Sequence, residues 1–262
     1  MTDDKMPLTA HLTELRTRLI ITMAAIVVGS IGSYIFAEQI FAFLAAPLIE
    51  ALPADSSLIF TGVAEGFFTY LKTALYSGVF FAMPVVLFEI WRFISPGLYK
   101  KEKRFGLPFI FFSTLFFVGG AAFGYYIVFP FGFQFFLGFE TDAIHPLPSI
   151  KEYLSFTVKL IMAFGLIFEL PLFTFFLARM GIVTGKFMAS QRRYAILLIF
   201  VISATITPPD PLTQIMMAGP LIVLYELSII VARVFGKERD KDKEDVPEDD
   251  GDDEGPDEEL AG

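Results

Sequence analysis

The stretch FISPGLYKKEKR, residues 93–104, joins two long apolar segments of the chain by a short, strongly charged turn. Ser95 followed by Pro96 is typical of a helix start, because the serine oxygen can cap the first turn and proline needs no N–H donor there. Four cations follow, with Glu102 in their midst. Cations beside a membrane span usually set its orientation. The acid is either a partner of its basic neighbours or a binding point for an incoming cation.

The composition is typical of a polytopic membrane protein. Of 262 residues, 55% are hydrophobic, only 19% are charged and 32 are phenylalanine, which is too apolar for a soluble domain of this size. The absence of cysteine excludes disulfides and thiolate-bound metals. The sequence also lacks HExxH, GxSxG and P-loop motifs, so we expect no enzyme, no metal and no cofactor.

Apolar runs predict six transmembrane helices, at about residues 19–36, 67–93, 105–129, 153–179, 194–207 and 212–234. The fifth run has only 14 residues, which reach about 21 Å and fall short of a hydrocarbon core of ~30 Å. Residues 235–262 hold 14 acids against 4 bases. We therefore expect an all-α membrane domain over residues 1–235 and an acidic, disordered cytoplasmic tail over residues 236–262.

Three local features refine this arrangement. The segment from Pro7 to the first span has leucines at helical spacing and predicts an amphipathic helix. In the first long connection, short interfacial helices are expected on either side of Pro47. In the third span, small residues should let a neighbouring helix approach closely. These residues are Gly119, Gly120 and Gly124.

The distribution of Lys and Arg predicts the orientation. Seventeen of the 20 fall in the N-terminus, the two short turns, their flanks and the tail, and the exceptions are Lys72, Lys151 and Lys159. The positive-inside rule therefore places both termini and the short turns in the cytoplasm. The two long connections, residues 37–66 and 130–153, would face outward.

Polar residues within the spans are candidate functional sites. Glu169 lies deep in the fourth span and is followed by Pro171. A charge at mid-membrane costs ~3 kcal/mol or more, so this residue is either a neutral, hydrogen-bonded structural acid or a polar patch used in transport or partner contact. Thr207, Asp210 and Gln214 cluster at the outer end of the last two spans. Spans this short would thin the bilayer or lie beneath a partner.

Glu14 is an acid among cations in the N-terminal segment. It can pair with Arg18 at i,i+4, and that pair alone is a sufficient explanation. Yet Glu14 and Glu102 are predicted at the same cytoplasmic surface. Two carboxylates there could bind two guanidinium groups.

Four motifs in sequence, HLTELRTRL at 11–19, FISPGLYKKEKR at 93–104, GLIFELP at 165–171 and TPPDPLTQ at 207–214, resemble the TatC family, the multi-span C subunit of the twin-arginine protein translocase. The resemblance covers residues 8–235. It implies a cupped six-helix fold with a concave face, in the cytoplasmic (inner) membrane. It also implies a receptor that binds twin-arginine signal peptides of folded proteins and exports them using the proton-motive force. The implied partners are single-span TatA/TatB-type subunits, other copies of the chain and membrane lipid, but no nucleic acid.

The same resemblance assigns roles to individual residues. Glu14 and Glu102 would recognise the arginine pair, and Glu169 would line the concave groove that accepts the apolar part of the signal. Other positions matching the signal-binding surface are Arg16, Phe93 and Leu98. The positions matching the region where single-span partners dock are Thr207, Asp210 and Gln214. The structural prolines are Pro47 and Pro84.

Two other functions fit the sequence less well. A secondary transporter of a small solute could use Glu169 and Lys159 as a proton relay, but it would need central charges shared among several spans. A purely structural scaffold would tolerate loss of both Glu14 and Glu102. The most prominent polar sites are predicted at the cytoplasmic surface, which favours the receptor.

Overall fold

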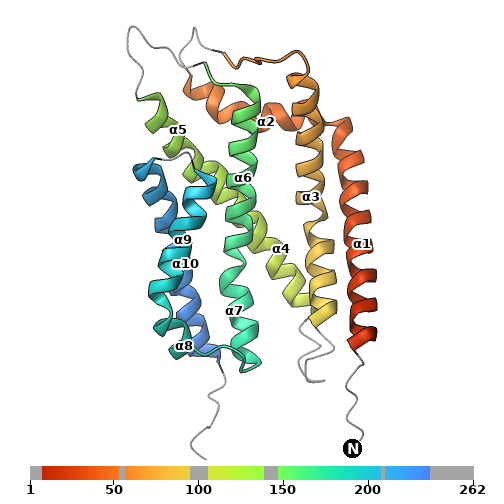
Figure 1. Ribbon diagram of the computed structural model, residues 1–262, viewed down its shortest axis with the longest axis vertical. Coiled ribbons are helices and arrows are strands. Elements are labelled where there is room, and N and C mark those ends of the chain that lie inside the picture. The colour runs from red at the N-terminus through yellow and green to blue at the C-terminus, as the bar shows by residue number, and fades with distance from the viewer. Residues whose placement is uncertain (1–7, 53–56, 95–105, 139–146, 208–209, 237–262) are drawn as a thin grey trace, which may run out of the picture.

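The computed structural model describes residues 8–52, 57–94, 106–138, 147–207 and 210–236, and in these ranges the chain is helical apart from short connections and one isolated β-bridge. The helices form an elongated bundle (Figure 1). In chain order they are α1 (Leu8–Ile35), α2 (Ala37–Ala51), α3 (Glu65–Ile94), α4 (Gly106–Phe123), the π-helical turn η3 (Gly124–Val128), α5 (Phe129–Leu137), α6 (Ile150–Phe168), α7 (Leu170–Arg179), α8 (Gly185–Ser190), α9 (Arg192–Ile206) and α10 (Pro211–Phe235).

Five segments of the described chain are long and apolar enough to cross a membrane, namely Leu12–Ile35, Glu65–Phe93, Gly106–Phe135, Ile150–Arg179 and Thr213–Phe235. They correspond to five of the six predicted spans. The remaining one is α9, a helix of 15 residues that reaches only about 22 Å. The prediction of an all-α membrane fold is thus confirmed, whereas the count of six spans remains a prediction.

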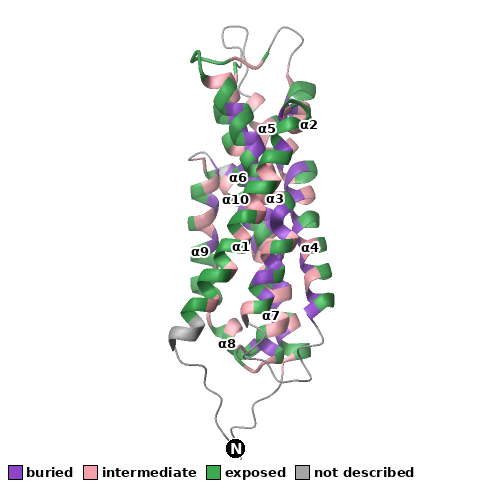
Figure 2. Cartoon of the chain, turned by 90° about the vertical axis from the view of Figure 1, so that its right-hand side faces the viewer, coloured by how far each residue is buried: buried purple, intermediate pink, exposed green. Residues whose placement is uncertain are grey.

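The predicted amphipathic helix and the first span form one continuous helix, α1, which packs along α3 at one edge of the bundle (Figure 1). Glycine makes this contact close: a Cβ atom on Gly78 would lie 2.4 Å from the backbone nitrogen of Ser30. Most of α1 is exposed, as Figure 2 shows, and only 6% of its most apolar stretch is buried inside the bundle. Exposed apolar side chains such as Val28 and Ile31 suit contact with lipid.

The third predicted span is longer than expected and crosses the bundle diagonally (Figure 1). Its helix widens at η3, where the N–H of Phe129 bonds the carbonyl of Gly124. The next residue, Pro130, has no N–H to donate. π-Helical turns are rare and occur mostly as single turns inside α-helices, and the span here continues through the turn to Phe135.

Close packing of α4 and η3 on α6 uses two of the three predicted glycines. A Cβ on Gly120 would meet the carbonyl oxygen of Phe164 at 2.5 Å, and one on Gly124 would lie 3.1 Å from the Leu160 side chain. Gly119 has nothing within 4 Å, so its predicted role in packing is wrong. It lies on another face of the helix, one residue or about 100° away from Gly120. The α6 side contributes Gly165, which faces the ring of Phe117.

The prediction of separate short helices around Pro47 is also wrong, because α2 is a single helix that passes through this proline. Proline cannot donate to the carbonyl four residues earlier, that of Phe43. The hydroxyl of Tyr125 donates to this carbonyl instead, and the hydroxyl of Tyr153 donates to the adjacent carbonyl of Leu44. These bonds compensate for the proline and hold α2 across the ends of η3 and α6.

Replacing Tyr125 with phenylalanine is therefore expected to destabilise the protein by about 1 kcal/mol, because the Phe43 carbonyl would lose its donor in a partly buried setting. Thermal unfolding of the detergent-solubilised protein measures the effect. The matched control is Tyr126→Phe, since Tyr126 is 65% exposed. Equal unfolding temperatures for the two variants would contradict this role of the Tyr125 hydroxyl.

The two long connections are joined to each other. Ile59 and Ser149 form a parallel β-bridge, in which the Ile150 N–H donates to the Ile59 carbonyl at 2.9 Å. The Glu65 carboxylate adds a second link: one oxygen accepts from the Thr61 N–H and the other from the Ser149 hydroxyl, both at 2.7 Å. The start of α3 is thereby tied to the start of α6.

Candidate functional site

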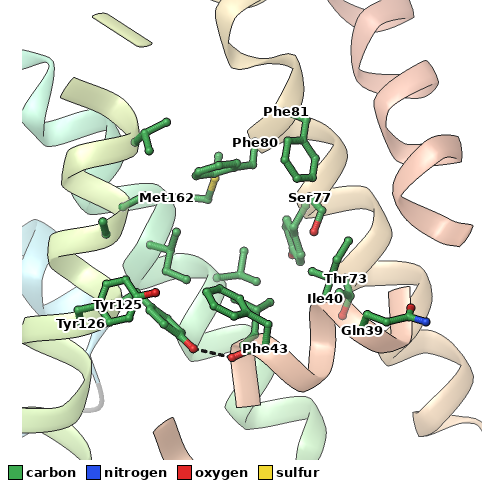
Figure 3. Close-up of a pocket in the computed structure, with 17 residues that line it drawn as sticks. Gln39, Ile40, Phe43, Thr73, Ser77, Phe80, Phe81, Tyr125, Tyr126 and Met162 are labelled. Carbon is green, nitrogen blue, oxygen red and sulfur yellow. Dashed lines mark hydrogen bonds between the residues drawn. The ribbon is translucent and has the colours of Figure 1, made fainter. Parts of the chain in front are cut away.

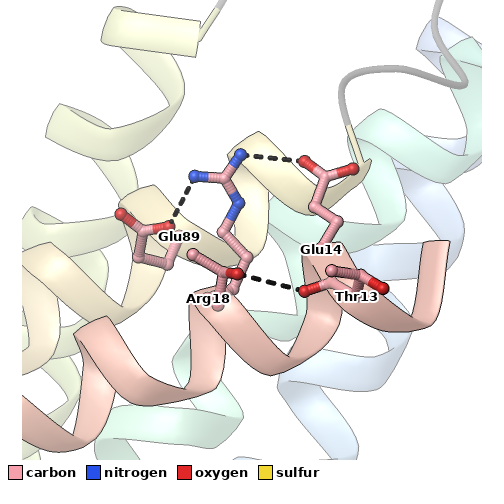
Figure 4. Close-up of polar contacts among 5 residues, drawn as sticks. Thr13, Glu14, Arg18 and Glu89 are labelled. Atoms are coloured by element: carbon pink, nitrogen blue, oxygen red, sulfur yellow. Dashed lines mark hydrogen bonds and ion pairs between the residues drawn. The ribbon is translucent and has the colours of Figure 1, made fainter. Parts of the chain in front are cut away.

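A cluster of three charged residues joins α1 to α3 at the end of the bundle where α1 begins (Figure 4). Arg18 donates from Nη2 to Glu14 Oε1 at 2.8 Å and from Nη1 to Glu89 Oε2 at 3.1 Å. The side chains become more buried with depth, with 22% of Glu14 exposed, 14% of Arg18 and 5% of Glu89. Two carboxylates share one guanidinium, so the cluster carries one surplus negative charge.

The α3 side of the cluster lies beside a packed aromatic contact with α4. Two residues beyond Glu89, the buried ring of Trp91 stacks on Phe109 of α4 with ring centroids 4.7 Å apart. A Cβ on Gly106, the first residue of α4, would lie 2.4 Å from the Trp91 Nε1 atom. The end of α3 therefore meets the start of α4, and this aromatic packing fixes the position of Glu89 along the bundle.

The other predicted signal-binding residues are only partly described. Arg16 is exposed on α1, and Phe93 is partly buried near the end of α3. Leu98 and Glu102 lie outside the described residues. The joint binding of two guanidinium groups by Glu14 and Glu102 accordingly stays a prediction. The ion pair of Glu14 with Arg18 is confirmed.

Glu169 occupies a break in the fourth span, between α6 and α7. Its side chain is 2% exposed, and its Oε2 accepts a hydrogen bond from Ser113 of α4 at 2.8 Å. Its Oε1 atom is buried with no partner in the described part of the chain. Glu169 is thus enclosed between α4 and the α6–α7 break, and it does not lie on an open surface. Lys159, its suggested relay partner, is exposed ten residues earlier, about 15 Å along the helix.

The polar residues of the last two helices form local hydrogen bonds. Asp210 caps α10 by accepting the Thr213 N–H at 2.8 Å. The Gln214 amide donates to the Phe200 carbonyl of α9 at 3.0 Å, and the Thr207 hydroxyl donates to Ser203 at 2.8 Å. Only the Gln214 bond joins α9 to α10, whereas the other two close the ends of their own helices. The outer face of the hairpin is apolar. Exposed residues of α9 on that face are Tyr194, Leu197, Leu198 and Val201.

An apolar cavity of about 420 Å³ lies among α2, α3, α4, η3 and α6 (Figure 3). The side chains that line it include Phe43, Phe80, Phe81, Tyr126 and Met162, with the hydroxyls of Thr73 and Ser77 at one side. Val118 also lines the cavity and follows Ser113 by five residues, or about 7.5 Å of helix. Five residues also rotate the helix by about 500°, so Val118 and Ser113 point to different faces of α4.

Comparison with known proteins decides the family. Residues 10–220 match the family model described as Sec-independent protein translocase protein (TatC). A protein of that name from Desulforapulum autotrophicum is 55% identical over 243 residues, covering 93% of this chain and 90% of the relative. The chain belongs to the TatC family. Membership in this translocase family confirms the predicted resemblance and the expectation of a transport protein rather than an enzyme.

Further relatives agree in length and in fold. The TatC protein of Magnetococcus marinus is 47% identical, with 90% of this chain and 88% of the relative covered. A crystal structure described as the twin-arginine translocase receptor TatC superposes with a TM-score of 0.79 at 42% identity, covering 85% of this chain and 97% of that one. The bundle described above is therefore the TatC fold.

Sequence reasoning missed several partners within this TatC chain. No motif singles out Glu89, yet it accepts a hydrogen bond from Arg18 across 71 residues of sequence. Ser113 gave no signal at all before its contact with Glu169. Both contacts depend on the helical register between different spans, which no local motif contains.

Proposed function

We propose that this chain is the receptor subunit of a twin-arginine translocation system, and that it binds twin-arginine signal peptides at the end of the bundle that carries Glu14. The carrying observation is the charged cluster there, in which two carboxylates share one guanidinium. A second guanidinium, from the signal, would neutralise the surplus charge. Carboxylates suit this role because they bind guanidinium groups with charge-assisted hydrogen bonds.

Glu102 would supply the second carboxylate for the arginine pair. The meeting of Trp91 with Gly106 supports this assignment, since it brings together the helix ends from which residues 95–105 depart. Arg16, Phe93 and Leu98 would complete the surface. The basic residues of the same segment would serve mainly to set topology.

The orientation follows from the cation count. We propose six spans, with α9 as the fifth, in a multi-pass protein of the cytoplasmic (inner) membrane with both termini in the cytoplasm. Residues 1–235 form the membrane domain in this proposal, and residues 236–262 form an acidic cytoplasmic tail. The hydrogen-bonded long connections would then lie on the outer side. The energy source would be the proton-motive force, because the sequence has no nucleotide-binding motif.

The apolar part of the signal would lie on a concave face near Glu169. Support comes from the apolar cavity beside α2 and from Glu169, which is buried with one unpartnered carboxylate oxygen. A buried carboxyl with an unpartnered oxygen is costly in an apolar setting. A signal helix that brings a hydrogen-bond donor to Oε1 would relieve this cost.

Single-span TatA/TatB-type subunits would dock on the α9–α10 hairpin. Gln214 joins the two helices of this hairpin, while Thr207 and Asp210 cap the helix ends at its turn. The α9 helix presents an apolar face of 55–64% exposed side chains. A span of 15 residues would thin the bilayer locally and so favour a neighbouring helix. Other copies of the chain and lipid would cover the remaining apolar surface.

A charge reversal at Glu102 tests the receptor function. Glu102→Lys should abolish cross-linking of the protein to a twin-arginine signal peptide while leaving it inserted, because an added cation on the cytoplasmic side does not oppose the topology. Membrane fractionation checks insertion, and Glu50→Lys, at the opposite end of the bundle, is the control. Normal cross-linking of Glu102→Lys would contradict the receptor function and favour a transporter or scaffold.

A further inference from the structure

Glu89 is a buried acid with no assigned role, in contact with a residue that touches Glu14. We infer that Glu89 is a positioning residue for the signal-binding carboxylate: it holds one arm of the Arg18 guanidinium so that Arg18 cannot close fully over Glu14. This inference rests on the proposed binding of twin-arginine signals by Glu14. It assigns a function to the contact between α1 and α3.

The geometry of Arg18 carries the argument. Guanidinium and carboxylate groups commonly pair through two parallel bonds, which occupy both carboxylate oxygens. Here the two terminal nitrogens are divided: Nη2 binds Glu14 at 2.8 Å, and Nη1 binds Glu89 at 3.1 Å. Glu14 therefore receives a single bond on Oε1. No described residue bonds its Oε2, which is left for an incoming donor.

The order of burial supports the same arrangement. Glu89, at 5% exposure, is the innermost member, and Glu14, at 22%, is the outermost. The third donor of Arg18, its Nε, is buried with no partner in the described chain. The two ion pairs therefore account for the orientation of the guanidinium. The pair with Glu89 determines how closely the guanidinium can approach Glu14.

Loss of the inner acid should have a definite consequence. Glu89→Gln removes the charge that draws Nη1 inward, so both nitrogens can turn to Glu14 and occupy both of its oxygens. The signal would then compete with a neighbour that is covalently part of the same helix, at very high effective concentration. We expect Glu89→Gln to weaken binding of a synthetic twin-arginine signal peptide by about tenfold, a typical size for coupling between contacting charges.

A second substitution separates positioning from mere stability. In the double variant Arg18→Gln/Glu89→Gln, the Arg18 guanidinium no longer competes with the signal for Glu14. The affinity for the peptide should therefore recover to within about threefold of that of the unsubstituted protein. A residue that only stabilised the fold would lower the fraction of competent protein without changing its Kd. Isothermal titration in nanodiscs reports both quantities, as stoichiometry and Kd. The matched control is Glu226→Gln, which breaks another ion pair, that of Arg192 with Glu226 at 2.8 Å, and should leave Kd unchanged.

The outcomes are distinct. Tenfold weaker binding by Glu89→Gln with recovery in the double variant supports the inference. An unchanged Kd in Glu89→Gln, or a double variant that binds no better than the single one, overturns it. If the unsubstituted protein fails to prefer the twin-arginine peptide over a twin-lysine peptide, the proposed receptor function itself fails, independently of Glu89.

Discussion

Glu14→Lys is expected to eliminate detectable binding of a twin-arginine signal peptide. The substitution changes the charge of the cluster from one surplus negative to one surplus positive, since Arg18 stays paired with the buried Glu89. An incoming guanidinium would then meet two cations where it now meets a carboxylate. Removing one partner of a desolvated charge pair costs about 2–5 kcal/mol, and the added repulsion should bring the loss of affinity to at least about 100-fold.

Titration of the peptide against purified Glu14→Lys measures this effect, and export of a folded reporter with a twin-arginine signal measures its consequence in cells. The protein should remain inserted, because a cytoplasmic lysine agrees with the positive-inside rule. Glu38→Lys, near the start of α2 at the far end of the bundle, provides the control. Residual affinity within a few-fold of the unsubstituted protein would refute the assignment of Glu14.

Gly78→Val should have the second large effect, and it acts through packing. A Cβ on Gly78 would lie 2.6 Å from the Ser30 Cα and 2.4 Å from its nitrogen. These are backbone atoms, which cannot rotate out of the way, so α1 must move away from α3. Overpacking typically costs 1–3 kcal/mol and occasionally more, and the upper end applies here.

The displacement should also impair binding, because Glu14 and Arg18 lie on α1 while Glu89 lies on α3. We therefore expect a lower unfolding temperature together with loss of peptide binding. The matched control is Gly66→Val, on the same helix, where an added Cβ would meet nothing within 4 Å. If the two variants behaved alike, close contact of α1 with α3 would not be a requirement for the site.

The spans themselves were largely predictable. The apolar runs of residues 67–93 and 212–234 match α3 and α10 to within two residues at each end, because burial in lipid selects for uninterrupted apolar sequence. Prolines were harder to interpret. Pro47 does not interrupt α2, since the carbonyl that it leaves without a donor is bonded by Tyr125, 78 residues later in the chain.

The same contrast holds at the proposed signal-binding site. Glu14, its pair with Arg18 and the oddity of Glu169 follow from the sequence alone, since a charge within an apolar helix requires a partner and an i,i+4 pair is local. The family can also be identified from the sequence, by four short motifs that occur in order along the chain. Periodicity and charge count are local properties, and they are sufficient for these conclusions.

Only the tertiary structure decided which distant groups meet. The contacts of Glu89 with Arg18, of Ser113 with Glu169 and of Gly78 with Ser30 each join two helices. Such contacts depend on the rotation and axial register of one helix against another, and rotating a helix by a single residue turns a side chain by about 100°. The sequence determined the helices and one acid of the site, and the packing of α1 on α3 determined what surrounds that acid.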